Sequence, residues 1–122
     1  MKNSFICVFY YTFVRQKTIK MKILHTSDWH LGHVLYNNDR SEEQKTMLEQ
    51  IISIVQNHKP DVFLIAGDVY HTSQPPSSIQ TLFANSIMSL HNANPKMQVI
   101  ITAGNHDSAI KHEIFRQPWQ AL

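Results

Sequence analysis

Three short apolar runs, each followed at once by a cluster of polar residues, constrain the fold of this 122-residue chain more than any other feature. The runs are residues 22–26, 62–66 and 97–102. Residues 62–66 are too few for a helix and show no alternation of apolar and polar side chains, which is typical of a strand covered on both faces. We expect three strands, and the last should also be buried.

Two segments with helical spacing separate these runs. Ser41 and Gln44 match a capping box, which predicts a helix start there, and Lys59 before Pro60 predicts its end. The apolar positions of the two helices are Met47, Leu48, Ile51, Ile52 and Val55, then Ile79, Leu82, Phe83, Ile87 and Leu90. The order β-α-β-α-β predicts an α/β fold, with parallel strands, right-handed crossovers and helices flanking the sheet.

Residues 1–20 differ in composition from the rest of the chain. They carry four basic residues and no acidic one, so the net charge of +2 leaves seven basic and nine acidic residues, about −2, from Met21 onward. No basic stripe therefore announces nucleic acid. The apolar residues 5–14 are too few to span a membrane, which takes roughly 20. A signal or anchor and a loosely packed extension remain open, but we favour a miscalled start, with the domain covering residues 21–122. Cys7 is the only cysteine, which excludes an internal disulfide and fits a reducing cytoplasm.

Candidate metal ligands follow each predicted strand. Asp28 and His30 come after the first, Asp68 after the second, and Asn105 with His106 after the third. Parallel strands end at one edge of a sheet, where ligands of α/β folds bind. All three glycines of the chain lie in or beside these clusters, as expected where the backbone turns tightly. We therefore expect the five side chains to converge.

The residue types suit a pair of metal ions. Asp28 and His30 can reach one ion, and mixed oxygen and imidazole ligands favour manganese, iron or zinc over calcium. Asp68, expected on the middle strand, can bridge two ions that clamp a phosphoryl displacement. Asn105 offers an oxygen to the second ion, and His106 can donate a proton or hydrogen bond to phosphate. Taken singly, these residues could be a solvated turn, a cap and a surface histidine. Three clusters together favour a metal centre, because crowded carboxylates are costly without compensation.

Four nearby residues have open roles. His25, within the first strand, suits the core or a contact to a ligand better than metal binding itself. His33 could contact substrate or be an exposed loop histidine. Trp29 could pack under its loop or stack on a base, and we favour packing. Asp107 could orient His106 or cap the following segment, and we favour the cap.

The motifs SDWHLG, AGDVYH and GNHD resemble the first three motifs of the calcineurin-like metallophosphoesterases, and MKILHTSDWHLGH is similar to the D subunits of SbcCD nucleases. The resemblance implies a two-manganese exonuclease and endonuclease acting on DNA ends and hairpins in recombination and repair. It also implies an SbcC-type ATPase partner with a coiled coil, and a homodimer of the full-length subunit. The likeness gives the five residues above the same roles. It adds His71, three positions after Asp68, as a residue close to the substrate.

One departure from the family pattern concerns the end of the chain. Relatives complete the metal shell with Gly-His and Gly-His-x-His motifs, and this chain stops at Leu122 without them. We therefore expect half of a metallophosphoesterase sandwich, with weak manganese binding, little or no turnover and apolar sheet surface left open. A phosphomonoesterase or cyclic-nucleotide phosphodiesterase with the same metal core is an alternative. A non-catalytic remnant that binds a partner is another.

Overall fold

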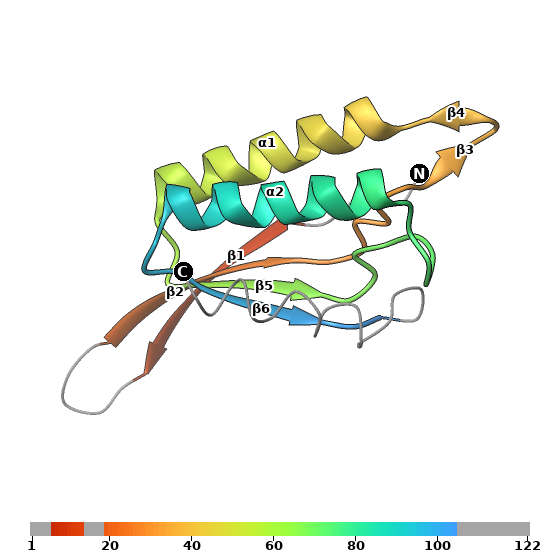
Figure 1. Cartoon of the computed structure of the whole chain (residues 1–122). Coiled ribbons are helices and arrows are strands. Elements are labelled where there is room, and N and C mark those ends of the chain that lie inside the picture. Colours follow the sequence, from red (N-terminus) through yellow and green to blue (C-terminus); the bar gives the residue numbers. More distant parts are fainter. Residues whose placement is uncertain (1–5, 14–18, 105–122) are drawn as a thin grey trace.

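The computed structural model describes residues 6–13 and 19–104 of the chain (Figure 1). Within these residues, a four-stranded sheet has the strand order β1-β2-β5-β6, and a short hairpin forms a separate two-stranded sheet. Figure 1 shows both helices on the same face of the larger sheet. The bounds are β1 Ile6–Phe13, β2 Ile19–Thr26, β3 Val34–Leu35, β4 Asn38–Asp39, α1 Ser41–His58, β5 Val62–Ala66, α2 Ser77–Ala93 and β6 Gln98–Thr102.

The three predicted strands are parallel and adjacent. β2 pairs with β5 and β5 with β6, so that His25 lies beside Leu64 and Leu64 beside Ile100. α1 connects β2 to β5, and α2 connects β5 to β6. The predicted β-α-β-α-β order is therefore confirmed, and β5 is the middle strand of the three.

The core lies between the helices and the sheet. The side chains of Leu24, Phe63 and Ile65 face it from the strands and are at most 1% exposed. The helices contribute the predicted apolar stripes, whose buried members are Leu48, Ile51, Val55, Ile79, Phe83, Ile87 and Leu90. Removing each such side chain from water contributes about 1.5–3 kcal/mol to stability. This packing fixes the edge of the sheet where the polar clusters lie.

The opposite face of the sheet is less covered than the sequence suggested. In β5, Phe63 and Ile65 are buried, but Val62 and Leu64 on the other face are only half-buried. In β6 the side chains are half-buried or exposed, and Ile100 is 48% exposed. The predictions that β5 is covered on both faces and that β6 is buried are therefore wrong for the described part of the chain. Both faces are apolar, but the helices cover one.

β1 is an element that the sequence did not predict. Its residues pair antiparallel with the whole of β2, from Ile6 beside Thr26 to Phe13 beside Ile19. β2 itself begins before Met21, so it is longer than the predicted strand. The start of the domain at Met21 remains a prediction. In the described part of the chain, every helix is too short or too polar to cross a membrane.

α1 has the predicted bounds but a different start from the predicted one. Ser41 donates its backbone N–H and its hydroxyl to Oδ1 of Asp39, two positions before it in the chain. The Gln44 side chain points away from the helix start, to the loop after β2. The capping box is therefore wrong. The end at His58 is confirmed, because Lys59 adopts a left-handed conformation with φ 46°.

Candidate metal centre

The loop after β2 carries Asp28 and His30 in an unusual backbone conformation. Their φ angles are 57° and 46°, in the left-handed region that non-glycine residues rarely adopt. Each such residue costs of the order of 1–3 kcal/mol and persists only where surrounding contacts impose it. The hydroxyl of Ser27 also donates to Oδ2 of Asp28 at 2.8 Å. The loop therefore holds both candidate ligands in a fixed turn.

The loop after β5 has the same character and is bonded to the first loop. Gly67 and Asp68 have φ angles of 76° and 50°. The backbone N–H of Asp28 donates to the carbonyl of Gly67 at 3.2 Å, and that of His30 to the carbonyl of Asp68 at 2.9 Å. Leu31 continues the pattern with Val69 at 2.8 Å. The two loops thus extend the parallel pairing of β2 and β5 beyond the strands.

This pairing brings three of the predicted ligands together. Nε2 of His30 lies 3.6 Å from Oδ1 of Asp28 and 3.9 Å from Oδ2 of Asp68. One ligand atom from each of the three residues lies within 4.8 Å of the others. Ligand atoms that share an ion at about 2.0–2.2 Å are themselves roughly 3–4 Å apart, so the spacing fits a single cation. The two carboxylates and the imidazole form a donor set suited to a divalent transition metal.

Exposure differs across the three ligands. The side chains of His30 and Asp68 are 17% and 16% exposed, whereas that of Asp28 is 48% exposed. Two ligands are therefore partly withdrawn from water and one faces it. A centre with this geometry can bind an ion firmly on the protein side and leave the solvent side open to a substrate.

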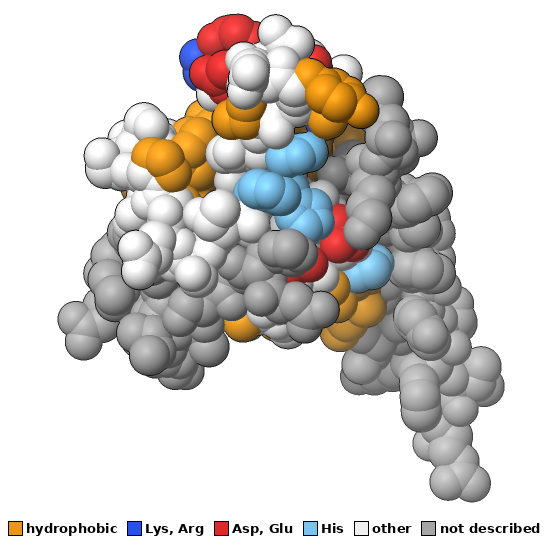
Figure 2. Space-filling model, turned by 90° about the vertical axis from the view of Figure 1, so that its right-hand side faces the viewer, with side chains coloured by type: hydrophobic (Ala, Val, Ile, Leu, Met, Phe, Trp, Pro, Cys, Tyr) orange, Lys and Arg blue, Asp and Glu red, His pale blue; other side chains and the backbone are white. Residues whose placement is uncertain are grey.

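Two further histidines extend the centre. The ring of His71 lies 5.6 Å from that of His30 and 4.3 Å from that of His33, measured between centroids. Figure 2 shows histidine side chains gathered next to acidic side chains on this face. His71 therefore lies near the predicted ligands, although its role near a substrate stays a prediction. His33 is half-buried against His71, so the interpretation as an exposed loop histidine is wrong.

The third loop approaches Asp68 through Gly104. A Cβ atom built on Gly104 would overlap Oδ1 and the backbone nitrogen of Asp68, so only glycine fits there without movement. A Cβ on Gly67 would lie 3.2 Å from Cα of Gly104. The structure thus places the end of the third strand against the second ligand loop. Asn105, His106 and Asp107 lie outside the described residues, so their assigned roles remain predictions.

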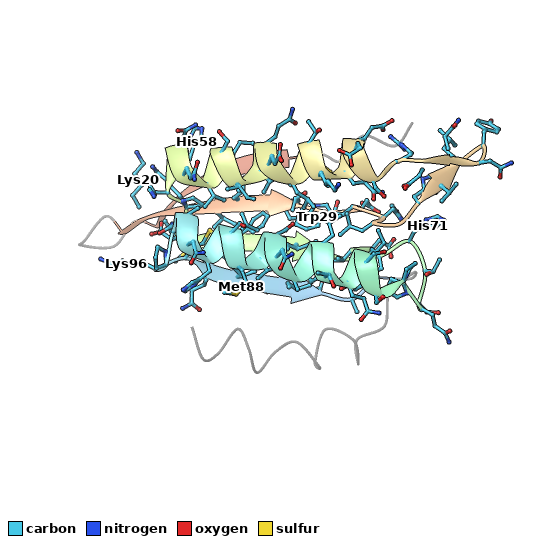
Figure 3. All side chains as sticks on the ribbon, turned by 45° about the horizontal axis from the view of Figure 1, so that its top comes forward. Lys20, Trp29, His58, His71, Met88 and Lys96 are labelled. Carbon is cyan, nitrogen blue, oxygen red and sulfur yellow. The ribbon has the colours of Figure 1, made fainter. Side chains whose placement is uncertain are left out.

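Trp29 supports the first loop from beneath. It is 4% exposed, and its indole N–H donates to the hydroxyl of Thr26 at 2.9 Å. Its ring packs against Phe63 and Phe83, with centroids 6.3 and 6.1 Å away. Figure 3 shows Trp29 in the layer between the helices and the sheet, and His71 at the end of the sheet opposite His58. The packing role predicted for Trp29 is confirmed. His25 is half-buried in β2 and is not one of the three converging ligands.

Gln44 contributes to the centre and was misassigned from the sequence. Its Oε1 accepts from the backbone N–H of Gly32 at 3.1 Å, and its Nε2 donates to the carbonyl of His30 at 3.2 Å. A signal did exist in the sequence, because Gln44 precedes Leu48 by four positions and Ile51 by seven, on the apolar stripe of α1. A buried polar residue on such a stripe needs partners.

Comparisons with known proteins agree with this geometry. The sequence model of the calcineurin-like phosphoesterase family matches residues 21–122. The chain is 40% identical over 88 residues to the D subunit of the SbcCD nuclease of Escherichia coli strain K12, a match that covers 72% of this chain and 22% of that protein. The corresponding D subunit of Bacillus subtilis strain 168 is 39% identical over 88 residues, with the same coverage of 72% and 22%. That of Rhodobacter capsulatus is 37% identical over 93 residues, 76% of this chain and 23% of that protein. The chain thus spans less than a quarter of each of these relatives.

Proposed function

Because the chain belongs to the calcineurin-like phosphoesterase family, we propose that it supplies the first metal-binding part of a DNA nuclease subunit that hydrolyses phosphodiester bonds. The observation that carries this proposal is the convergence of Asp28, His30 and Asp68 at the carboxyl edge of the parallel sheet. Folding alone does not require two carboxylates and an imidazole in such proximity, on backbone that is itself costly to form.

In this proposal each residue has one task. Asp28 and His30 hold one divalent cation, Asp68 bridges it to a second, and Asn105 holds the second. The cations supply Lewis-acid stabilisation of the charge that develops on the phosphate. His106 donates a hydrogen bond to the same phosphate oxygens.

His71 contacts the substrate in this proposal. Its ring lies on the side of His30 that leads to His33, and its backbone N–H donates to the carbonyl of Leu31 at 3.0 Å. The fixed backbone holds the imidazole beside the metal ligands. A phosphate oxygen bound at the exposed side of the centre is then within reach of its ring N–H.

Manganese is the metal that we propose. Carboxylate and carbonyl oxygens favour Mg²⁺, Ca²⁺ and Mn²⁺, and imidazole shifts the preference towards transition metals, so a set of two carboxylates and a histidine suits Mn²⁺. The family resemblance supports the same ion.

The substrate and the partners follow from the relatives. We propose DNA ends and hairpins as substrates, an SbcC-type ATPase as the partner and a homodimer for the longer subunit, in the cytoplasm. The names of the relatives, which are subunits of SbcCD nucleases, support the first two parts of this proposal.

Metal binding by the 122-residue chain tests the proposal first. Isothermal titration with Mn²⁺ should give binding for the unmodified chain and none for Asp68→Asn. Glu49→Gln removes a carboxylate from the exposed side of α1 and should leave the affinity unchanged. Equal affinity of Asp68→Asn and the unmodified chain would instead favour a partner-binding remnant.

Nuclease activity requires a second experiment. A version completed with downstream sequence that contains a Gly-His-x-His segment should cleave linear duplex DNA in Mn²⁺, and Asp68→Asn should not. Cleavage of small phosphate esters without cleavage of DNA would identify a phosphomonoesterase or a cyclic-nucleotide phosphodiesterase. Robust DNA hydrolysis by the 122-residue chain alone would contradict the need for the missing histidines.

A further inference from the structure

The side chain of Gln44 joins α1 to the loop that carries the metal ligands. It is 8% exposed, although it is polar and lies on the same buried stripe as Leu48, Ile51 and Val55. Its two amide groups are both used, one by the N–H of Gly32 and one by the carbonyl of His30. An apolar side chain would fill this position as well, so the contacts to the loop are what distinguish glutamine here.

The two peptide groups that Gln44 binds flank Leu31, in a segment with costly backbone angles. His30 has φ 46° and Gly32 has φ 86°. The sheet holds Leu31 from one side, because its N–H donates to Val69 and its carbonyl accepts from His71. Gln44 holds the neighbouring peptide groups from the helix side. The turn is therefore fixed between the sheet and the helix.

We propose that Gln44 is a positioning residue of the metal centre. By fixing the carbonyl of His30 and the N–H of Gly32, it keeps the imidazole of His30 directed at Asp28 and Asp68. Gln44 does not itself touch the metal in this proposal. The inference rests on the proposed metal centre and assigns to α1 a role in binding that centre's ion.

Gln44→Met tests the inference, because methionine has nearly the same length and lacks both hydrogen-bonding groups. The dissociation constant for Mn²⁺ should rise about tenfold, the lower range of effects seen when a partner of a ligand is lost, equivalent to ~1.4 kcal/mol. In the metal-free chain, hydrogen exchange of the Gly32 amide, measured by NMR, should accelerate about tenfold or more. Both measurements are made where circular dichroism shows each variant fully folded.

Two controls separate positioning from general destabilisation. Gln56→Met changes an exposed glutamine on the same helix and should alter neither quantity. Ile87→Val weakens the core in the second half of α2, and should lower the melting temperature without changing the affinity for Mn²⁺. Gln44→Asn provides a second variant, because asparagine is one methylene too short to reach both partners and should also weaken binding.

The outcomes that would overturn the inference differ from those that concern the metal centre. Unchanged Mn²⁺ affinity in Gln44→Met, even with a lower melting temperature, would show that Gln44 only packs. A loss of affinity in Ile87→Val equal to that in Gln44→Met would show the same. Absence of Mn²⁺ binding by the unmodified chain would refute the metal centre, and the positioning role with it.

Discussion

Replacing Gly104 by alanine tests the contact between the end of β6 and the centre. Gly104 has no positive φ, so an alanine there meets no backbone strain. Taken alone, the change should stabilise the chain by about 0.4–1 kcal/mol, because alanine restricts the unfolded state. The added Cβ, however, would overlap Oδ1 and the backbone nitrogen of Asp68. These atoms cannot move as freely as the end of a flexible side chain.

The structure sets the size and the sign of the expected effect. Forcing an extra carbon into a packed site costs typically 1–3 kcal/mol, and the overlap with backbone places Gly104→Ala at the upper end. We expect a net loss of about 2 kcal/mol, or roughly 8 °C in melting temperature for a chain of this size. Gly32→Ala should cost less, about 1 kcal/mol. Its φ of 86° strains alanine, but its Cβ would meet only the side chain of Ile79, at 3.4 Å.

Urea denaturation followed by circular dichroism measures both free energies of unfolding. Titration with Mn²⁺ then measures the second consequence, since an alanine at position 104 must displace the Asp68 carboxylate and weaken metal binding. If Gly104→Ala were more stable than the unmodified chain and bound Mn²⁺ with the same affinity, the close approach of β6 to Asp68 would be refuted.

Three further substitutions probe other features. Trp29→Phe removes the indole N–H that Thr26 accepts, and should lower the free energy of unfolding by about 1–3 kcal/mol in urea denaturation; an unchanged value would contradict the role of this bond. Ser41 lowers the pKa of Asp39 chiefly by its side-chain hydrogen bond, so this interaction stabilises the fold above the carboxyl group's unfolded pKa and is lost as pH falls through the folded pKa. Ser41→Ala should therefore raise the pKa of Asp39 towards its ordinary value in an NMR titration, and no change would show that the hydroxyl is not a partner. Ile100→Ser, on the open face of the sheet, should alter stability by less than about 0.5 kcal/mol, and a loss of several kcal/mol would mean that this face is covered.

The convergence of the ligands was predictable from the sequence for a simple geometric reason. Asp28 and Asp68 each follow an apolar run, and parallel strands end at one edge, so strand order alone brings them together. The helices were predictable because their apolar residues recur at helical spacing. The sequence could not show the left-handed angles of Asp28, His30 and Asp68, because these depend on hydrogen bonds between two loops that are distant in the chain.

The failures share a different cause. Ser41 and Gln44 have the spacing of a local cap, and no local pattern reveals that the Gln44 side chain binds a loop 12 to 14 positions earlier. The apolar character of Ile100 shows that it favours burial, not that a covering element is present. β1 was missed because its apolar residues fit a strand, an anchor or an extension equally well, and only pairing with β2 decides among them.

The backbone bonds that join the loops after β2 and β5 also determine when a cation can be recognised. Asp28 and Asp68 meet only once the two strands have aligned and their ladder has been extended into the loops. A folding intermediate without that alignment presents scattered ligands of low affinity. Mn²⁺ would then act late, slowing the unfolding rate while leaving the refolding rate nearly unchanged.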